Sequence, residues 1–262
     1  MQEKQSIVIK IGTSSIAHST GLVNILNMER LIKVISDVKN FGHNIILVSS
    51  GAIGIGFGKL GMLERPKDVP SKQAAAAVGQ CELMYIYDKM FTEYNHKIAQ
   101  VLLSADAFQH ENVLANIKNT FSKLAQMNTI AIVNENDTVA TDEILFGDND
   151  NLSAQVAVLT NSDKLIILSD INGLYDKNPK TNADARLISK VYNITSEITK
   201  MASISTSGLG TGGMLTKLQA ANFATTNNID TYIINGNEPN GIYKILENKS
   251  VGTHFLKKGE QL

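Results

Sequence analysis

The sequence predicts an α/β protein with a mainly parallel sheet that is covered by helices on both faces. Short, almost continuous apolar runs, such as residues 7–11 and 165–168, are typical of strands that are buried on both sides. Amphipathic stretches separate these runs, and residues 28–41 place apolar side chains on one helical face before Gly42 ends the helix. Strands that alternate with helices in this way form a parallel, doubly covered sheet.

Six strands and five helices are expected along the chain. The strands span residues 7–11, 44–48, 97–103, 129–133, 165–168 and 231–234, and the helices span residues 28–41, 72–91, 113–127, 152–160 and 215–227. The helix at 113–127 is assigned by its apolar face, and the helix at 72–91 by its length and its alanines. Ligands of such sheets bind beyond the carboxyl ends of the strands, so residues that directly follow a strand are candidate site residues.

Composition limits the organisation of the chain and its partners. With 262 residues, 43% of them hydrophobic, the chain is long enough for one large α/β domain, and no Pro-rich or Ser-rich linker divides it. The 24 Lys and Arg balance 25 Asp and Glu, so neither nucleic acid nor a membrane is expected as a partner. The polar residues 1–5 precede an apolar run that is too short for a signal peptide or a membrane span, which predicts a cytoplasmic protein.

The reactive side chains that most often build metal sites are sparse. Cys81 is the single cysteine, which excludes an internal disulfide, and its alanine-rich surroundings predict a buried thiol on a helix. The five histidines lie far apart and show no paired ligand spacing. A histidine-built or cysteine-rich metal site is therefore not expected.

The surrounding residues exclude two familiar nucleotide-binding motifs. The pattern GxGxxG occurs at residues 208–213 and again at residues 56–61. The first follows the polar segment 195–207 instead of an apolar strand, and neither is followed by a suitably placed acid for a ribose. A Walker A motif is also excluded, because Met214 stands where that motif requires lysine.

Polar side chains nevertheless gather at the strand ends. Lys10 lies inside the first strand, and glycine turns with Ser or Thr follow the first two strands. Two further polar segments are Asn-Glu-Asn-Asp at 134–137 and Gly-Asp-Asn-Asp-Asn at 147–151. Each feature alone has a simpler reading: a surface lysine, an Asx turn or a helix cap. Together with the Gly-Gly turn that opens the helix before Lys217, they supply cations, backbone amides and carboxylates, which are the groups that phosphoryl transfer needs.

These residues resemble the amino acid kinase superfamily and, within it, the glutamate 5-kinase family. The similar motifs are Lys-Ile-Gly-Thr-Ser at 10–14, Val-Ser-Ser-Gly-Ala-Ile at 48–53, Asn-Glu-Asn-Asp at 134–137, Phe-Gly-Asp-Asn-Asp at 146–150 and Thr-Gly-Gly-Met-Leu-Thr-Lys at 211–217. Residues 73–80, 100–106 and 170–175 add support, so the resemblance spans nearly the whole chain. Ser169 departs from the threonine that is usual in the family, but it keeps the hydroxyl.

The resemblance implies a three-layer αβα sandwich over a sheet of about eight strands, formed by residues 1–262 as a single domain. The N-terminal part would mainly bind the amino acid, and the part from about residue 160 would mainly bind ATP. Many relatives carry a further C-terminal PUA domain, and because this chain ends at Leu262 none is expected here.

The resemblance also implies roles for individual residues. Lys10 and Lys217 would act on the transferring phosphoryl group, with Asp150 orienting both. The implied substrate-binding residues are Ser50, Gly51, Asn134, Asp137 and Asn149, and the implied ATP-binding residues are Lys10, Gly12, Ser169, Asp170, Thr211, Gly212, Gly213, Met214 and Lys217. No protein metal site is implied, because the phosphates of ATP would hold most of the Mg²⁺ coordination.

The implied reaction is ATP-dependent phosphorylation of the γ-carboxylate of L-glutamate, the first step of proline synthesis. Proline as a feedback inhibitor, a homo-oligomer and coupling to a glutamyl phosphate reductase are implied with it. Three alternatives stay open: a family member with a different acceptor, an amino-acid sensor without turnover on the same fold, and a dinucleotide-dependent oxidoreductase.

Overall fold

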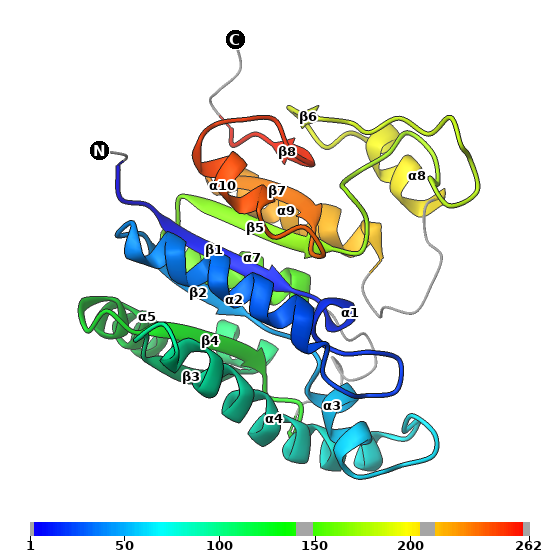
Figure 1. Cartoon of the computed structure of the whole chain (residues 1–262). Helices are drawn as coiled ribbons and strands as arrows, with labels where there is room; N and C mark the ends of the chain where they lie inside the picture. The colour runs from blue at the N-terminus through cyan, green and yellow to red at the C-terminus, as the bar shows by residue number, and fades with distance from the viewer. Residues whose placement is uncertain (1–2, 140–148, 205–212, 259–262) are drawn as a thin grey trace.

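The computed structural model describes residues 3–139, 149–204 and 213–258, and its centre is one eight-stranded sheet (Figure 1). The strands are β1 (Ser6–Ile11), β2 (Asn44–Val48), β3 (Ile98–Leu103), β4 (Ile130–Glu135), β5 (Lys164–Ser169), β6 (Lys190–Val191), β7 (Asp230–Asn235) and β8 (Thr253–Phe255). Their order across the sheet is β3-β4-β2-β1-β5-β7-β8-β6, and every neighbouring pair is parallel except β7 with β8. The mainly parallel sheet of about eight strands is thus confirmed.

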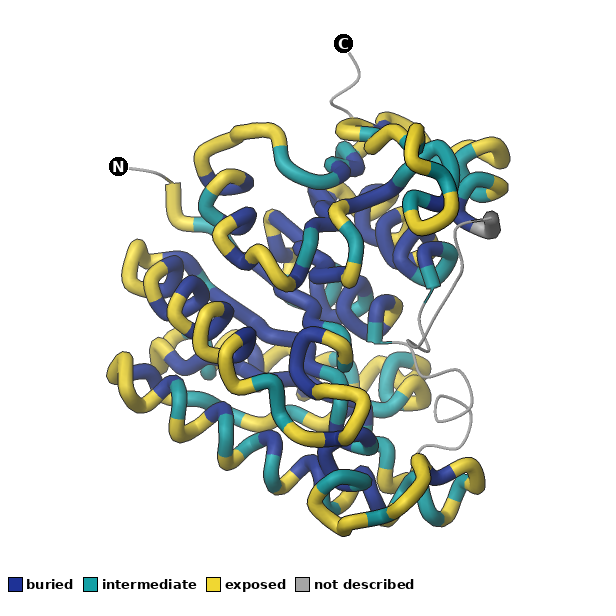
Figure 2. Tube along the Cα trace, turned by 45° about the vertical axis from the view of Figure 1, so that its right-hand side comes forward, coloured by how far each residue is buried: buried dark blue, intermediate teal, exposed yellow. Residues whose placement is uncertain are grey.

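Helices cover both faces of this sheet. They are α1 (Thr13–Ile16), α2 (Ile25–Asn40), α3 (Ala52–Lys59), α4 (Val69–Thr92), η1 (Ala105–Gln109), α5 (Glu111–Gln126), α7 (Asn149–Leu159), α8 (Ser196–Ile204), α9 (Met214–Thr226) and α10 (Gly241–Leu246). One core layer joins the sheet to α2, α4 and α10, and a second joins its other face to α5, α7 and α9. Figure 2 shows the buried strands between the more exposed outer faces of the helices. The structure is therefore the predicted αβα sandwich.

Alternation along β1 determines where Lys10 can reach. Ile7, Ile9 and Ile11 belong to the core layer of α2 and α4, whereas Val8 belongs to the layer of α7 and α9. Because successive strand residues point to opposite faces, Lys10 lies on the same face as Val8. The lysine at the carboxyl end of the central strand therefore faces α7 and α9.

All six expected strands and all five expected helices are present, with ends that differ by one helical turn at most. The sequence missed β6 and β8, because two-residue and three-residue strands carry too little apolar pattern. It also missed helix α8, which occupies much of the polar segment 195–207.

Helix α3 was missed because three glycines in eight residues argue against a helix. Here Gly56 of α3 and Gly79 of α4 allow the two helices to pack closely. A Cβ at Gly56 would lie 1.8 Å from the carbonyl oxygen of Ala75, and a Cβ at Gly79 would lie 1.8 Å from the carbonyl oxygen of Ala52. The GxGxxG pattern at 56–61 therefore belongs to a helix–helix contact and the turn after it.

The expectation of a buried thiol at Cys81 is wrong, because its side chain is exposed on α4. The buried face of this helix carries Leu83, Tyr87 and Phe91 at a spacing of four residues. Alanine-rich surroundings do not distinguish the two faces of a helix, so the sequence pattern could not place Cys81.

Within the part of the chain that the structure describes, no helix has both the length and the apolar character that crossing a membrane requires.

Candidate functional site

The candidate site lies where the carboxyl ends of β1, β2, β4 and β5 meet at one edge of the sheet, close to α1 and α3 (Figure 1). The starts of α7 and α9 reach the same region, because Asp150 and Lys217 come from their first turns and contact each other. Four strand ends and two helix starts therefore contribute to one site.

Asp150 holds Lys10 and Lys217 together. The Lys10 Nζ lies 2.7 Å from Asp150 Oδ1, and the Lys217 Nζ lies 3.0 Å from Asp150 Oδ2. The side chain of Asp150 is fully buried, and those of the lysines are 7% and 8% exposed. Among the described residues this triad carries two positive charges and one negative charge, so it has an excess positive charge in a site that water barely reaches. Such an arrangement favours an anion.

Thr216 lies within the segment 211–217 that was predicted to bind ATP, but it carried no predicted role of its own. Its hydroxyl lies 3.0 Å from Asp150 Oδ2 and 2.8 Å from the carbonyl oxygen of Gly213, and both oxygens can only accept. Thr216 links the turn before α9 to the buried carboxylate. Its position directly before Lys217 in the motif was the available signal.

Asn149, the first residue of α7, connects the carboxyl ends of two strands, β2 and β4. Its Nδ2 lies 2.6 Å from the carbonyl oxygen of Ser49, 3.1 Å from Ser50 Oγ and 2.8 Å from Asn134 Oδ1. The same Asn134 oxygen accepts a hydrogen bond from the backbone N–H of Glu135 at 2.9 Å. Three of the predicted substrate residues, Ser50, Asn134 and Asn149, are thus brought together.

Gln80 on α4 holds Asn134 in place, and the sequence analysis gave Gln80 no role of its own. Its Oε1 accepts a hydrogen bond from Asn134 Nδ2 at 2.8 Å, and both side chains are buried. Ser49 is held from the same helix, because its hydroxyl lies 2.9 Å from the Tyr87 hydroxyl. Burial raises the pKa of the Tyr87 phenol, and the hydrogen bond to Ser49 offsets part of this effect, so the phenol stays neutral.

Replacing Gln80 by leucine is expected to destabilise the fold by about 1–3 kcal/mol, because Asn134 Nδ2 would remain buried without its acceptor. Urea unfolding measures this loss. The matched control is Gln126→Leu on the exposed side of α5, which should change stability by about 0.5 kcal/mol or less. If both variants unfolded at the same urea concentration, the hydrogen bond between Asn134 and Gln80 would not stabilise the fold.

Gly51 and Asp137 lie at the ends of neighbouring strands. Gly51 has φ 98°, a left-handed conformation that glycine adopts without strain, and it lets the chain turn from β2 directly into α3. Asp137 is half-buried in the turn after β4. Both therefore belong to the edge that carries Asn149.

The predicted nucleotide residues that the structure describes come from the ends of β1 and β5 and from the start of α9. A Cβ at Gly12 would lie 3.8 Å from Lys10 Nζ, so glycine keeps the space beside that ammonium open. Ser169 is buried at the end of β5, whereas Asp170 is exposed and lies 3.3 Å from Lys180 Nζ. Gly213 caps α9, Met214 packs its side chain into the core, and Thr211 and Gly212 lie outside the described residues.

Within the described ranges, no three His, Cys, Asp or Glu side chains are grouped so that they could hold a metal ion.

Known proteins resemble this chain in sequence and in fold. The amino acid kinase family matches residues 5–235. A glutamate 5-kinase of Clostridium perfringens is 50% identical over 99% of this chain and 98% of its own length, and a glutamate 5-kinase of Clostridium acetobutylicum is 48% identical over 97% of this chain and 95% of its own length. Among solved structures, a carbamate kinase of Giardia lamblia bound to AMP-PNP superposes with a TM-score of 0.66 at 16% identity, covering 98% of this chain and all of its own.

Proposed function

The chain belongs to the amino acid kinase family and, within it, to the glutamate 5-kinases, and from this membership we propose that it phosphorylates the γ-carboxylate of L-glutamate with Mg²⁺ and ATP. The observation that carries the chemistry is the buried triad of two lysines on one aspartate. The product is L-glutamyl 5-phosphate, whose formation is the first step of proline synthesis.

The reaction forms one bond and breaks one. A γ-carboxylate oxygen of glutamate attacks the γ-phosphorus of ATP, and the bond to the β,γ-bridging oxygen breaks, so that ADP leaves with that oxygen and its electrons. The γ-carboxylate has a pKa of about 4.3 and is already ionised at neutral pH. No proton has to be removed, and the work of the protein is alignment and stabilisation of charge.

Lys10 and Lys217 would supply the positive charge that the transferring phosphoryl group requires. They come from β1 and α9, two elements far apart in sequence, and Asp150 holds both ammonium groups within 3.0 Å of its oxygens. A cation that is already positioned needs no reorganisation when charge develops on the oxygens of the phosphoryl group. Asp150 would act as a positioning residue for both lysines.

The amino acid would bind on the side of Asn149. Ser50, Gly51, Asn134 and Asn149 form the polar strand ends there, and the Asp137 carboxylate suits the α-ammonium group of glutamate. ATP would bind on the side of β5 and α9, so the division of the single domain falls at about residue 160.

Backbone groups would hold much of the nucleotide. Gly12, Ser169, Asp170 and the segment that begins α9, from Thr211 to Lys217, are the proposed contacts, and a helix start offers its unpaired N–H groups to phosphate. Mg²⁺ would enter as the ATP complex and remain held mainly by phosphate oxygens. When bound, the ion neutralises charge on the leaving ADP.

The decisive experiment measures ADP release with glutamate, aspartate, N-acetylglutamate, carbamate and UMP as acceptors. Glutamate should be the substrate, and hydroxylamine should trap its acyl phosphate as a hydroxamate. Turnover with another acceptor and none with glutamate would assign a different family activity. Glutamate binding without any turnover would make the protein a sensor.

Proline is proposed to inhibit by occupying the glutamate pocket, because it shares an α-carboxylate and an α-nitrogen with glutamate. Raising the glutamate concentration should then relieve the inhibition completely, with the proline inhibition constant measured at several glutamate concentrations. Inhibition that persists at saturating glutamate would place proline at a separate site.

Three further proposals follow from family membership. The chain is proposed to form a homo-oligomer, which light scattering would test, and to work in the cytoplasm, where its co-substrate ATP is present. Because an acyl phosphate hydrolyses readily, a glutamyl phosphate reductase is proposed as the consumer of the product, and a coupled assay would show whether transfer outcompetes hydrolysis.

A further inference from the structure

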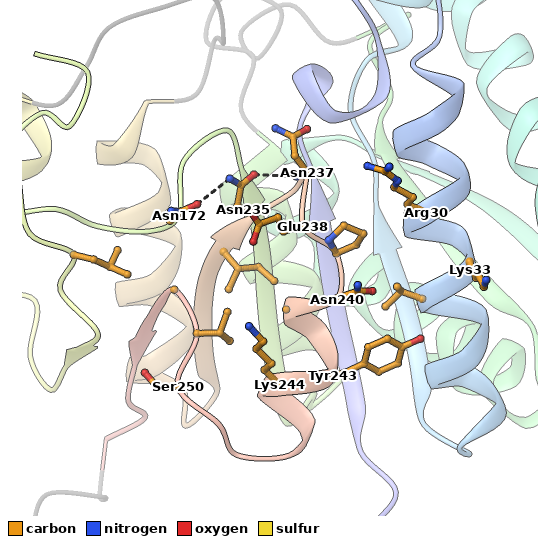
Figure 3. Close-up of a pocket in the computed structure, with 17 residues that line it drawn as sticks. Arg30, Lys33, Asn172, Asn235, Asn237, Glu238, Asn240, Tyr243, Lys244 and Ser250 are labelled. Atoms are coloured by element: carbon orange, nitrogen blue, oxygen red, sulfur yellow. Dashed lines mark hydrogen bonds between the residues drawn. The ribbon is translucent and has the colours of Figure 1, made fainter. Parts of the chain in front are cut away.

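A cavity of about 940 Å³ lies outside the site described above, between α2, the turn from β7 to α10 and residues 250–252 (Figure 3). Its size is at the upper end of the range of about 300–1,000 Å³ that is typical of small-molecule sites. It opens on the opposite face of the sheet from the triad. Ile234, which lines the cavity, belongs to the core layer of α2 and α10, whereas Met214 at the start of α9 belongs to the other layer.

The charges that line this cavity are predominantly positive. Arg30 and Lys33 come from α2 and Lys244 from α10, and all three are exposed. Within the described ranges none of the three has a carboxylate oxygen within 4.0 Å, and Glu238 is the one acidic residue among those that line the cavity. Asp37, which accepts a hydrogen bond from the Tyr243 hydroxyl at 2.9 Å, is not part of the lining. The cavity therefore suits a ligand with about two negative charges.

The other residues that line the cavity are suited to the uncharged, organic part of a ligand. Asparagine side chains contribute amides that both donate and accept, and in Figure 3 Asn235 and Asn237 lie toward the upper end of the cavity while Lys244 extends into it from below. Apolar side chains also line the cavity: Val34, Leu187, Ile234, Pro239 and Val251. Apolar side chains together with amides and exposed cations form the lining expected for a phosphate ester of moderate size.

The wall of the cavity is bonded directly to the proposed nucleotide segment. Asn235 pairs with Ser169 between β7 and β5, and the next N–H, that of Gly236, donates to the carbonyl oxygen of Ser169 at 2.8 Å. Asn235 Nδ2 also donates to Asn172 Oδ1 at 2.9 Å, and Asn172 lies two residues after Asp170. A ligand that contacts Asn172 and Asn235 would therefore act on the turn that carries Ser169 and Asp170.

We propose that this cavity binds a small phosphorylated metabolite, of the size of a mononucleotide or a sugar phosphate. Binding of this metabolite would change the affinity of the proposed nucleotide site for ATP. Arg30 and Lys244 would bind the phosphate group, since guanidinium and ammonium groups form charge-assisted hydrogen bonds with phosphate oxygens. The binding part of the proposal is independent of the proposed function, whereas the effect on ATP rests on it.

Calorimetric titration tests the binding part. The whole chain is first saturated with Mg²⁺, a non-hydrolysable ATP analogue and glutamate, so that the family site is filled. UMP and glucose 6-phosphate are then the probes, and uridine and glucose are their uncharged controls. We expect at least one phosphate ester to bind once per chain with a Kd below about 1 mM and its uncharged partner not to bind.

Matched variants connect the binding to the cavity. The double variant Arg30→Gln, Lys244→Gln should raise the Kd of the phosphate probe by about tenfold or more. The reason is that each charge-assisted hydrogen bond contributes about that factor to the affinity. Lys118→Gln, on an exposed face of α5 across the sheet, should bind like the parent chain. In parallel, the probe should shift the KM for ATP in the parent chain and leave it unchanged in the double variant.

Several results would overturn the proposal. They are equal binding of a phosphate ester and its uncharged partner, no binding of either phosphate probe, and unchanged binding in the double variant. Binding that appears only when the ATP analogue is omitted would show that the probe occupies the nucleotide site. If the chain lacked kinase activity, the titrations would still decide the binding part.

Discussion

Replacing Lys217 by methionine is expected to lower kcat by about 10²- to 10³-fold, which corresponds to roughly 3–4 kcal/mol of transition-state stabilisation. Methionine keeps much of the apolar length of the lysine side chain, so the buried stem still packs while the ammonium group is lost. The ammonium lies 3.0 Å from Asp150 and comes from the first turn of α9, beside the proposed phosphate contacts. Single-turnover rates at saturating ATP and glutamate measure the effect on the chemical step.

Lys118→Met on α5 is the control, because it removes an exposed lysine far from the strand ends and should retain the parent kcat. Lys10→Met should resemble Lys217→Met, and the double variant should lose less than the product of the two single losses if both ammonium groups act on one phosphoryl group. A kcat within about threefold of the parent for Lys217→Met would remove this lysine from the reaction and leave it a structural role.

Much of the sheet follows from local pattern, and the exceptions have physical reasons. Strands such as β1 and β5 are buried on both faces and carry four apolar residues each, so their positions could be predicted. Strand β8, which lies between β7 and the edge strand β6, has only three residues and runs antiparallel to β7, and neither property produces a periodic pattern in the sequence. Helix α3 forms despite its three glycines, because close packing on α4 outweighs the low helix propensity of glycine.

The site was less predictable than the fold, because its contacts join distant segments. That Lys10, Asp150 and Lys217 act together came from family resemblance, since nothing in the spacing of the three residues indicates that they meet. Gln80 and Asn134 are 54 residues apart, and their hydrogen bond depends on the rotation of α4 against β4. Thr216 could have been suspected from its motif, but its bond to Asp150 depends on how α9 packs against α7. These contacts are set by tertiary packing, which a single sequence does not encode locally.

Replacing Asp150 by asparagine is expected to have the largest combined effect on stability and activity. The carboxylate is fully buried between two ammonium groups, and removing one partner of a buried ion pair typically costs about 3–5 kcal/mol because the remaining charge has no compensation. Urea unfolding should show this loss, and kcat should fall because neither lysine keeps its position. Thr216→Val is the milder companion variant: it removes one hydrogen bond to Asp150 Oδ2 and should cost about 0.5–1.5 kcal/mol while the fold persists.

The pH dependence of Asp150→Asn separates a positioning role from that of a general base. Because the γ-carboxylate of glutamate is ionised above its pKa of about 4.3, the parent chain should show a nearly flat kcat/KM between about pH 6 and 8, with an acid limb near carboxylate pKa values. If Asp150 only positions Lys10 and Lys217, asparagine lowers the plateau and leaves the acid limb where it was. A base that accepts a proton during the reaction would instead produce a limb near pH 6.5–7 that disappears in this variant. Thr216→Val leaves the carboxylate in place, so under the positioning account it should keep the same limb as the parent with a plateau between those of the parent and Asp150→Asn.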